Sequence, residues 1–140
     1  MKLFVKLLDK KARLPSYAHE GDAGMDLYCL ERIVIKPGKR SQIKTGVAIK
    51  IPKGYVGLIW DKSGLAVKNG LTTIAGVIDS GYRGEIIIGM LNTDKKEYVF
   101  EPGHKVAQML IQSVKSMKIV EINQLNQTKR GSKGFGSTGK

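Results

Sequence analysis

An aspartate near the middle of the chain has the surroundings of a catalytic carboxylate. The segment 76–86, GVIDSGYRGEI, places Asp79 between a strand-like run and a glycine-rich turn, and Tyr82 follows shortly after it. A carboxylate at such a position can activate a water molecule, and a nearby aromatic ring can pack on a sugar. The alternative is a turn aspartate that caps backbone amides, which is the commoner role for an isolated aspartate in a turn.

Five further polar or small residues stand where an anion or a metal ion could bind. Lys62, Ser63 and Gly64 come at the start of a short predicted helix whose amides could face an anion, although Ser63 could equally be an ordinary N-cap. Asp26 lies in a short apolar segment, where it could orient a hydrated metal ion or satisfy backbone groups. Gln108 lies inside an apolar strand, so its amide must find partners in the backbone or in a ligand.

The C-terminal segment 130–140, RGSKGFGSTGK, contains two glycine patterns of phosphate-binding loops, GxGxxG and GxxxxGK. Both patterns require a strand before them and a helix after them, and no helical pattern follows here, so the Rossmann and P-loop interpretations fail. Glycines such as Gly136 would still let the backbone close on a ligand, with a hydroxyl from Ser137 and a phosphate fork from Arg130. Phe135 is the one aromatic residue of this segment, and its ring suits stacking on a base better than a purely solubilising tail does.

Composition narrows the classes of partner and of compartment. The net charge is +12, from 24 basic and 12 acidic residues, which suits an anionic partner such as a phosphorylated small molecule. Aromatic residues make up only 6% of the chain, too few for the interleaved aromatic and basic residues of a nucleic-acid-binding β domain. Lysines interrupt the N-terminal apolar run and there is one cysteine, so we expect a cytoplasmic protein without a signal peptide or membrane span.

The cysteine and the two histidines have no partners at the spacing of a metal site or of a catalytic pair. We therefore interpret Cys29, His19 and His104 as structural or surface residues. Zinc chemistry and thiol chemistry are poor explanations of this sequence.

Short apolar runs with a period of two predict an all-β protein. The predicted strands are 2–8, 32–35, 46–51, 55–60, 85–91, 98–100, 106–111 and 118–122. Pro-Gly and Asn-Gly turns separate several of them, and only residues 64–68 favour a short helix. We expect a distorted jelly-roll-like β-barrel with one short helix over residues 1–122, followed by a flexible, glycine-rich C-terminal arm over residues 123–140.

Five segments, taken in order, resemble the five motifs of the trimeric dUTPase (deoxyuridine 5'-triphosphate nucleotidohydrolase) family. The segments, which span residues 23–139, are AGMDLY, DKSGLA, GVIDSGYRGEI, GHKVAQ and RGSKGFGSTG. The resemblance implies a jelly-roll-like fold and hydrolysis of dUTP to dUMP and pyrophosphate with Mg²⁺, which keeps uracil out of DNA and supplies dUMP for dTMP synthesis. It also implies a homotrimer in which each active site draws on three chains, with the arm closing a neighbouring subunit's site.

The resemblance assigns the reaction to the third motif. Asp79 would contact the 3′-hydroxyl side of the sugar and activate the water that attacks the α-phosphorus, while Tyr82 would pack on deoxyribose and leave no room for a 2′-hydroxyl. A hairpin over residues 72–76 would read uracil through its backbone groups. The residues of this hairpin are Thr72, Thr73, Ile74, Ala75 and Gly76, and Gly76 and Val77 would bind the substrate.

The first, second and fourth motifs would hold the phosphates and the metal ion. Lys62, Ser63 and Gly64 would bind the phosphates, and Gln108 would contact the α-phosphate region. Asp26 would act through water on Mg²⁺. Triphosphate oxygens and waters would hold the ion chiefly, so we expect no direct protein ligand.

The arm would complete the site, and the sequence departs from the family pattern at two places. The arm residues that would contact the nucleotide are Arg130, Phe135, Gly136 and Ser137, with the ring over the uracil and Arg130 and Ser137 at the γ-phosphate end. Lys62 stands where the family commonly has arginine, and His104 and Lys105 stand where an acid followed by arginine is usual. Lysine supplies charge without a bidentate fork, so the grip on phosphate or the subunit contacts would differ here.

Two rival functions on a related fold are kept open. A dCTP deaminase would need an acid and a base that displace ammonia from cytosine, and no glutamate stands in a matching place. A regulatory dUTPase-like protein would have lost turnover, which the retention of Asp79, Tyr82 and Arg130 argues against. An added role in binding a partner is compatible both with hydrolysis of dUTP and with its loss.

Overall fold

The computed structural model describes residues 2–134, and within them the chain forms ten strands and one helix. In chain order the elements are β1 (Phe4–Leu7), β2 (Met25–Tyr28), β3 (Ile33–Ile35), β4 (Arg40–Lys50), β5 (Tyr55–Trp60), α1 (Ser63–Asn69), β6 (Leu71–Ile74), β7 (Val77–Ile78), β8 (Glu85–Asn92), β9 (Tyr98–Phe100) and β10 (Lys105–Ser113). The predicted all-β class with one short helix is confirmed.

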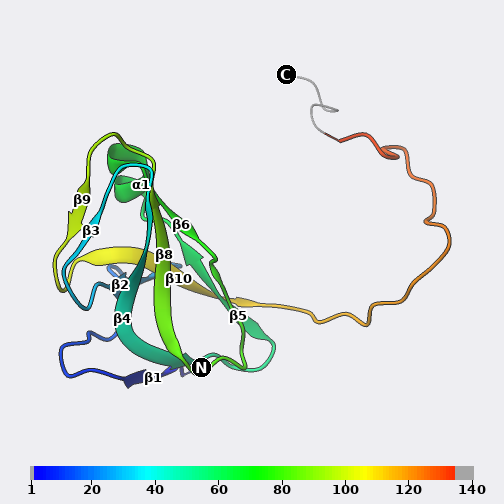
Figure 1. Ribbon diagram of the computed structural model, residues 1–140. Coiled ribbons are helices and arrows are strands. Elements are labelled where there is room, and N and C mark those ends of the chain that lie inside the picture. Colours follow the sequence, from blue (N-terminus) through cyan, green and yellow to red (C-terminus); the bar gives the residue numbers. More distant parts are fainter. Residues whose placement is uncertain (1, 135–140) are drawn as a thin grey trace.

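Two four-stranded sheets and a small third one form the barrel. The first sheet has the order β1-β4-β8-β6, the second has the order β2-β10-β5-β7, and β3 pairs with β9. Every pairing is antiparallel, and the ladders are interrupted within β4 and β10, where the register shifts. Such irregularities bend strands and let sheets curl around a core. Figure 1 shows the long strands β4 and β8 curving side by side, with β10 crossing behind them.

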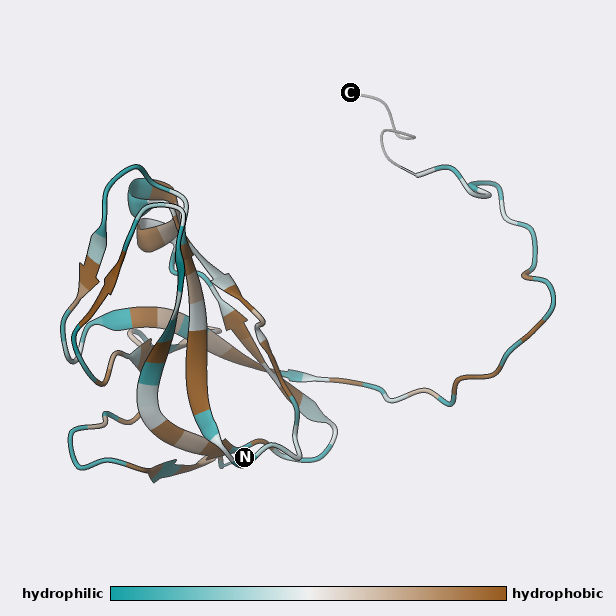
Figure 2. Cartoon of the chain, in the orientation of Figure 1, coloured by the Kyte–Doolittle hydropathy of each residue, from teal (hydrophilic) through white to brown (hydrophobic). Residues whose placement is uncertain are grey.

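The core lies between the sheets and follows the period of two. In β8, Ile86, Ile88 and Met90 are buried, whereas Ile87 between them is exposed. Each such side chain contributes about 1.5–3 kcal/mol when it is removed from water. The strands in Figure 2 carry apolar residues, and the connecting loops are largely hydrophilic. The barrel therefore offers a rigid frame for polar residues at its edges.

The helix begins at Ser63 and ends with a left-handed residue. Lys62 is the N-cap, no side chain caps the helix, and Gly70 at its other end has φ 62° and donates its N–H to the Ala66 carbonyl oxygen. Glycine adopts this conformation without the steric cost that other residues meet. The alternative that Ser63 is an ordinary N-cap is therefore wrong, because Ser63 is already the first helical residue.

The predicted hairpin at residues 72–76 is wrong as a description of the backbone. Strand β6 pairs with β8 in the first sheet, whereas β7 pairs with β5 in the second, so the two strands do not pair with each other. Residues 73–76 instead form a corner at which the chain passes from one sheet to the other, and we call this segment the sheet corner. Ala75 within it has a positive φ of 59°.

The barrel ends at Ser113, and the predicted strand 118–122 is wrong. From residue 114 to 134 the chain has no helix or strand, and Ile119 in the predicted strand is 96% exposed. Figure 1 shows this segment running away from the barrel. Within residues 2–134, this segment pairs with none of the edge strands of the three sheets. Among residues 2–134, no helix is long and apolar enough to cross a membrane.

Candidate active site

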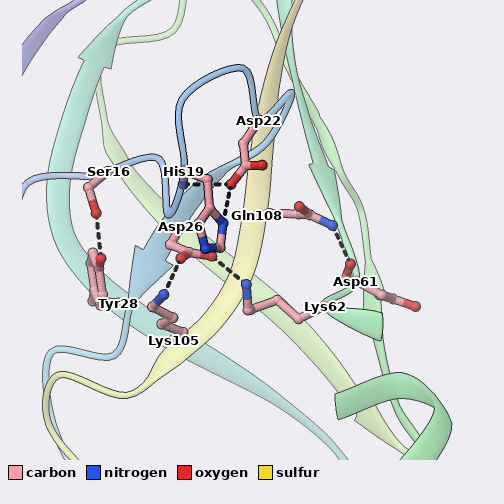
Figure 3. Close-up of polar contacts among 9 residues, drawn as sticks. All are labelled: Ser16, His19, Asp22, Asp26, Tyr28, Asp61, Lys62, Lys105 and Gln108. Carbon is pink, nitrogen blue, oxygen red and sulfur yellow. Dashed lines mark hydrogen bonds and ion pairs between the residues drawn. The ribbon is translucent and has the colours of Figure 1, made fainter. Parts of the chain in front are cut away.

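The candidate site is organised around Asp26, the one buried charged residue in the described part of the chain. Asp26 lies on β2 and is only 2% exposed. The Lys105 ammonium at the start of β10 lies 2.6 Å from its Oδ2, and the Lys62 ammonium beside α1 donates a hydrogen bond to its Oδ1. Figure 3 shows the carboxylate between the two lysines. One lysine ammonium group at each carboxylate oxygen offsets the cost of burying the negative charge.

The pKa values of this cluster follow from burial and charge. Burial opposes ionisation of Asp26, but the hydrogen bonds and charges of Lys105 and Lys62 outweigh it and hold the pKa of Asp26 below its ordinary value. The hydrogen bond and charge of Asp26 in turn raise the pKa of Lys105. The two lysines that replace the usual arginines of the family pattern thus meet on a single carboxylate.

Gln108 lies beside Asp26 in the second sheet and shares its cleft. In the pairing of β10 with β2, Gln108 is opposite Asp26, and its Nε2 donates to the Asp61 carbonyl oxygen at 2.8 Å. Gly24 packs against the Gln108 side chain so closely that a Cβ there would collide with it. The cleft has a volume of about 440 Å³, and its lining includes Gly24, Asp26, Trp60, Lys62 and Gln108. Predicted residues from three motifs therefore come together here.

Asp61 is a site residue that the sequence interpretation missed. Its Oδ1 accepts hydrogen bonds from the Thr73 N–H at 2.5 Å and the Thr73 hydroxyl at 2.7 Å, and its Oδ2 accepts one from the Thr72 hydroxyl at 2.9 Å. A second hollow of about 360 Å³ lies here, lined by Leu58, Ile59, Trp60, Asp61, Thr72, Thr73, Gly76 and Val77. The only sign of this role in the sequence was that Asp61 is an acidic residue directly before Lys62. The two threonines that bind its carboxylate come after the helix in the chain.

Asp79 and Tyr82 lie together on a separate part of the surface. Asp79 follows β7 and is exposed, and its carbonyl oxygen accepts the Tyr82 N–H at 3.0 Å. The Tyr82 hydroxyl donates to the Glu85 carbonyl oxygen at 2.9 Å. Their hollow has a volume of about 190 Å³ and is lined by Val77, Ile78, Asp79, Tyr82, Glu85 and Ile87. It shares no lining residue with the Asp26 cleft, and the Asp61 hollow, which shares Trp60 and Asp61 with that cleft and Val77 with this hollow, stands between them.

The Asp79 side chain is not used as a turn cap. Across residues 2–134, no backbone N–H donates to its carboxylate. The structural alternative for Asp79 therefore has no support in its hydrogen bonding, and the carboxylate is exposed for contact with a ligand.

The arm residues are placed only in part. Arg130 is exposed, and its Nε donates to the Lys133 carbonyl oxygen at 3.0 Å within a local turn. It makes no contact with the Asp26 cleft or the Asp79 hollow. The predicted contacts of Phe135, Gly136 and Ser137 lie outside the described residues.

The cysteine and the histidines have structural surroundings. Cys29 is buried, its Sγ donates to the Glu31 carbonyl oxygen at 2.8 Å, and burial raises its pKa. His19 lies 3.5 Å from the Asp22 carboxylate, and the His104 ring accepts the Glu101 N–H at 3.2 Å. A buried thiol with a raised pKa is a poor nucleophile.

The fold and the site together define a jelly-roll-like β-barrel with a charged cleft beside its one helix. A family model described as dUTPase matches residues 10–139. This chain belongs to the dUTPase family. The deoxyuridine 5'-triphosphate nucleotidohydrolase of Clostridium novyi (strain NT) is 48% identical over 141 residues, which cover 99% of each chain. That of Clostridium tetani (strain Massachusetts / E88) is 47% identical over 140 residues, covering 99% of this chain and 97% of the relative.

Solved structures agree with this family. A Staphylococcus bacteriophage 80alpha dUTPase mutant with dUpNHpp is 32% identical and matches with a TM-score of 0.93, covering 99% of this chain and 98% of the phage chain. A mutant dUTPase from phage phi11 of S. aureus, described with coordination of a structural Mg(II) ion, matches with a TM-score of 0.83 at 30% identity. That match covers 89% of this chain and 98% of the other. The jelly-roll-like fold expected from the sequence is thereby confirmed.

Proposed function

We propose that this chain hydrolyses dUTP to dUMP and pyrophosphate. The observation that carries the proposal is the dUTPase family match over residues 10–139, together with relatives at 45–48% identity that are named deoxyuridine 5'-triphosphate nucleotidohydrolases. The exposed Asp79 carboxylate and the charged Asp26 cleft supply the kinds of group that this reaction needs. The product dUMP would serve dTMP synthesis, and removal of dUTP would keep uracil out of DNA.

Asp79 would act as the general base. It would accept a proton from water while the water oxygen attacks the α-phosphorus in line, and the bond from that phosphorus to the bridging oxygen would break and release pyrophosphate. The exposure of Asp79 and its unused carboxylate support this role. Tyr82 would pack on deoxyribose and exclude a 2′-hydroxyl, and its bond to the Glu85 carbonyl would hold the ring in place.

The start of α1 and the cleft beside it would bind the phosphates. Because no side chain caps the helix, its first backbone N–H groups are available to a ligand, and a Cβ built at Gly64 would meet no atom within 4 Å. Lys62 would exchange its ion pair with Asp26 for a phosphate oxygen, while Lys105 would keep that carboxylate compensated. Gln108 would contact the α-phosphate region from the floor of the cleft.

Mg²⁺ would enter with the triphosphate. Within residues 2–134, no three His, Cys, Asp or Glu side chains gather as a metal site, whereas Asp26 places one carboxylate at the cleft. These residues fit an ion that phosphate oxygens and waters chiefly hold and that Asp26 orients through water. When bound, the ion would neutralise charge on the phosphate oxygens.

The active site would be assembled from three chains of a homotrimer, with residues 1–122 as the domain that contains the barrel and residues 123–140 as the arm. The separation of the Asp79 hollow from the Asp26 cleft supports a site shared between subunits. The course of residues 114–134 away from their own barrel supports an arm that reaches a neighbour (Figure 1). Arg130, Phe135, Gly136 and Ser137 would then close over the nucleotide. We expect this reaction to occur in the cytoplasm.

Pyrophosphate release from dUTP, dCTP, dTTP and UTP tests the proposal when each nucleotide is assayed with and without Mg²⁺. We expect cleavage of dUTP in preference to the other three, and faster cleavage with Mg²⁺. Preferred turnover of dCTP with release of ammonia would instead identify the deaminase. Binding of dUTP without any pyrophosphate release would identify a regulatory protein that has lost turnover.

A further inference from the structure

The end of β5 holds the sheet corner from both sides. On the β7 side, the Ile59 N–H donates to the Gly76 carbonyl oxygen at 2.8 Å. On the β6 side, the Asp61 carboxylate accepts one hydrogen bond from Thr72 and two from Thr73. Residues 59 and 61 are separated only by Trp60, so one short piece of chain fixes both ends of the corner.

The corner needs such anchors because its backbone includes an unfavourable conformation and lacks a neighbouring strand on one side. Ala75 has a φ of 59°, a left-handed conformation that alanine rarely adopts on its own. Strand β6 is the edge strand of its sheet, so its outward-facing amides have no neighbouring strand to bond. The Asp61 carboxylate supplies this missing acceptor for the Thr73 N–H at the residue where the corner begins.

We propose that Asp61 is a positioning residue for base recognition, whose carboxylate fixes the conformation in which the sheet corner reads uracil. This inference rests on the proposed function and on the expectation, from the family resemblance, that residues 72–76 read the base. Asp61 touches no substrate atom in this role and acts through Thr72 and Thr73. Hydrogen bonds to a carboxylate are stronger than those between neutral groups, so the corner is held firmly on its β6 side.

The side chain of Asp61 can be changed without removing its link to the phosphate side. Gln108 bonds the carbonyl oxygen of residue 61, which any replacement retains. A change in the carboxylate should therefore affect recognition of the base much more than binding of the phosphates. This separation gives the proposal a signature that a general loss of stability would not produce.

The experiment compares Asp61→Ala and Asp61→Asn with the full-length wild type, using kcat and KM for dUTP and dCTP. We expect Asp61→Ala to lose about tenfold or more in kcat/KM for dUTP, chiefly through KM, which corresponds to the loss of a hydrogen bond with a charged group. The preference for dUTP over dCTP should fall as well. Asp61→Asn, which keeps the shape and an acceptor oxygen, should restore most of the loss.

Single donor removals and a remote aspartate serve as matched controls. Thr73→Val removes one hydroxyl donor to Oδ1 and Thr72→Val removes the donor to Oδ2, so each should lower the dUTP preference less than Asp61→Ala does. If Asp61→Ala fails to fold, these two variants and Asp61→Asn decide the question. Asp9→Ala removes the carboxylate that accepts the Lys11 N–H in another loop, and its kinetics should match the wild type.

Binding provides a second readout through Trp60, the one tryptophan of the chain, which is 56% exposed and lines both the cleft and the Asp61 hollow. Titrations followed by its fluorescence should show weaker binding of dUMP to Asp61→Ala and unchanged binding of pyrophosphate. A folded Asp61→Ala with wild-type dUMP affinity and dUTP preference would overturn the inference alone. A wild type that shows no preference for dUTP would overturn the proposed function, and the inference with it.

Discussion

The two carboxylates expected to serve one reaction have opposite surroundings in this chain. Asp26 is buried and compensated by two lysines, whereas Asp79 is exposed, and no backbone amide of the described chain donates to its carboxylate. The Asp26 carboxylate is thus already held by contacts within its own chain, whereas the Asp79 carboxylate faces solvent. If the proposed roles hold, the fold of one chain already organises the phosphate-binding region around Asp26, whereas the region around Asp79 depends on what binds to it.

The largest expected effect concerns the exposed carboxylate of Asp79. Asp79→Asn should lower kcat by about 10²- to 10⁴-fold, as expected when a general base is removed. Nucleotide should still bind, because the Asp26 cleft is untouched. Single-turnover rates and dUMP affinity, measured on the same preparation, check both halves of this expectation. Turnover like that of the wild type would remove Asp79 from the mechanism.

The next effect concerns the arm. Deletion of residues 126–140 should leave the barrel folded, because the last strand ends at Ser113 and residues from 114 to 134 are exposed. Activity should fall by about 10²-fold, since the arm would supply contacts that position the substrate. Circular dichroism and sedimentation report the fold and the assembly, and pyrophosphate release reports the activity. A deleted chain that no longer forms a trimer would contradict the division between barrel and arm.

The smallest of the three effects concerns the buried carboxylate of Asp26. Asp26→Asn keeps the shape but removes the counter-charge of Lys62 and Lys105, and because both lysines stay partly exposed to water the free energy of unfolding should fall by only about 1.5 kcal/mol at neutral pH. The folded pKa of Asp26 lies below its unfolded value of about 4, so this contribution is fully present above about pH 4 and is lost as the pH falls through the folded pKa.

Urea unfolding of wild type and Asp26→Asn from pH 7 to pH 3, at one fixed chain concentration, measures this difference. The gap between the two proteins should narrow at the acid end. Asp94→Asn is the control, because Asp94 is exposed and its carboxylate bonds only its own loop among the described contacts. A gap that stays constant with pH would show that Asp26 is not held ionised by its lysines.

Local sequence patterns predicted the bounds of several strands and of the helix, but not which strands pair. The strands Tyr55–Trp60 and Tyr98–Phe100 agree with their predicted bounds because a turn or, after Trp60, the start of the helix limits each short apolar run. The helix extends the predicted 64–68 by one residue at each end. At 118–122, an alternating apolar pattern predicted a strand, but the pattern alone does not determine whether a sheet edge pairs with it. The hairpin at 72–76 failed for a related reason, since strand proximity in sequence does not determine which sheet each strand joins.

Chemistry at a distance was harder to predict than chemistry within a motif. Asp26, Lys62 and Gln108 were expected in one site, and they line one cleft. The convergence of Lys62 and Lys105 on Asp26 was not foreseen, because it depends on the pairing of β2 with β10. Asp61 was missed for the same reason, since its partners lie across the helix and only the folded chain brings them to its carboxylate.

Subunit complementation tests most directly whether the site is shared between chains. Asp79→Asn and the chain lacking residues 126–140 are each expected to be nearly inactive, and they are co-expressed in equal amounts under different affinity tags. Suppose that Asp79 and the arm of each site come from different chains of a closed trimer. Random mixing then gives about one site in four with both an intact Asp79 and an intact arm, so the whole mixture of trimers should show about a quarter of the wild-type activity. Activity no greater than the sum of the two separate variants would contradict a shared site.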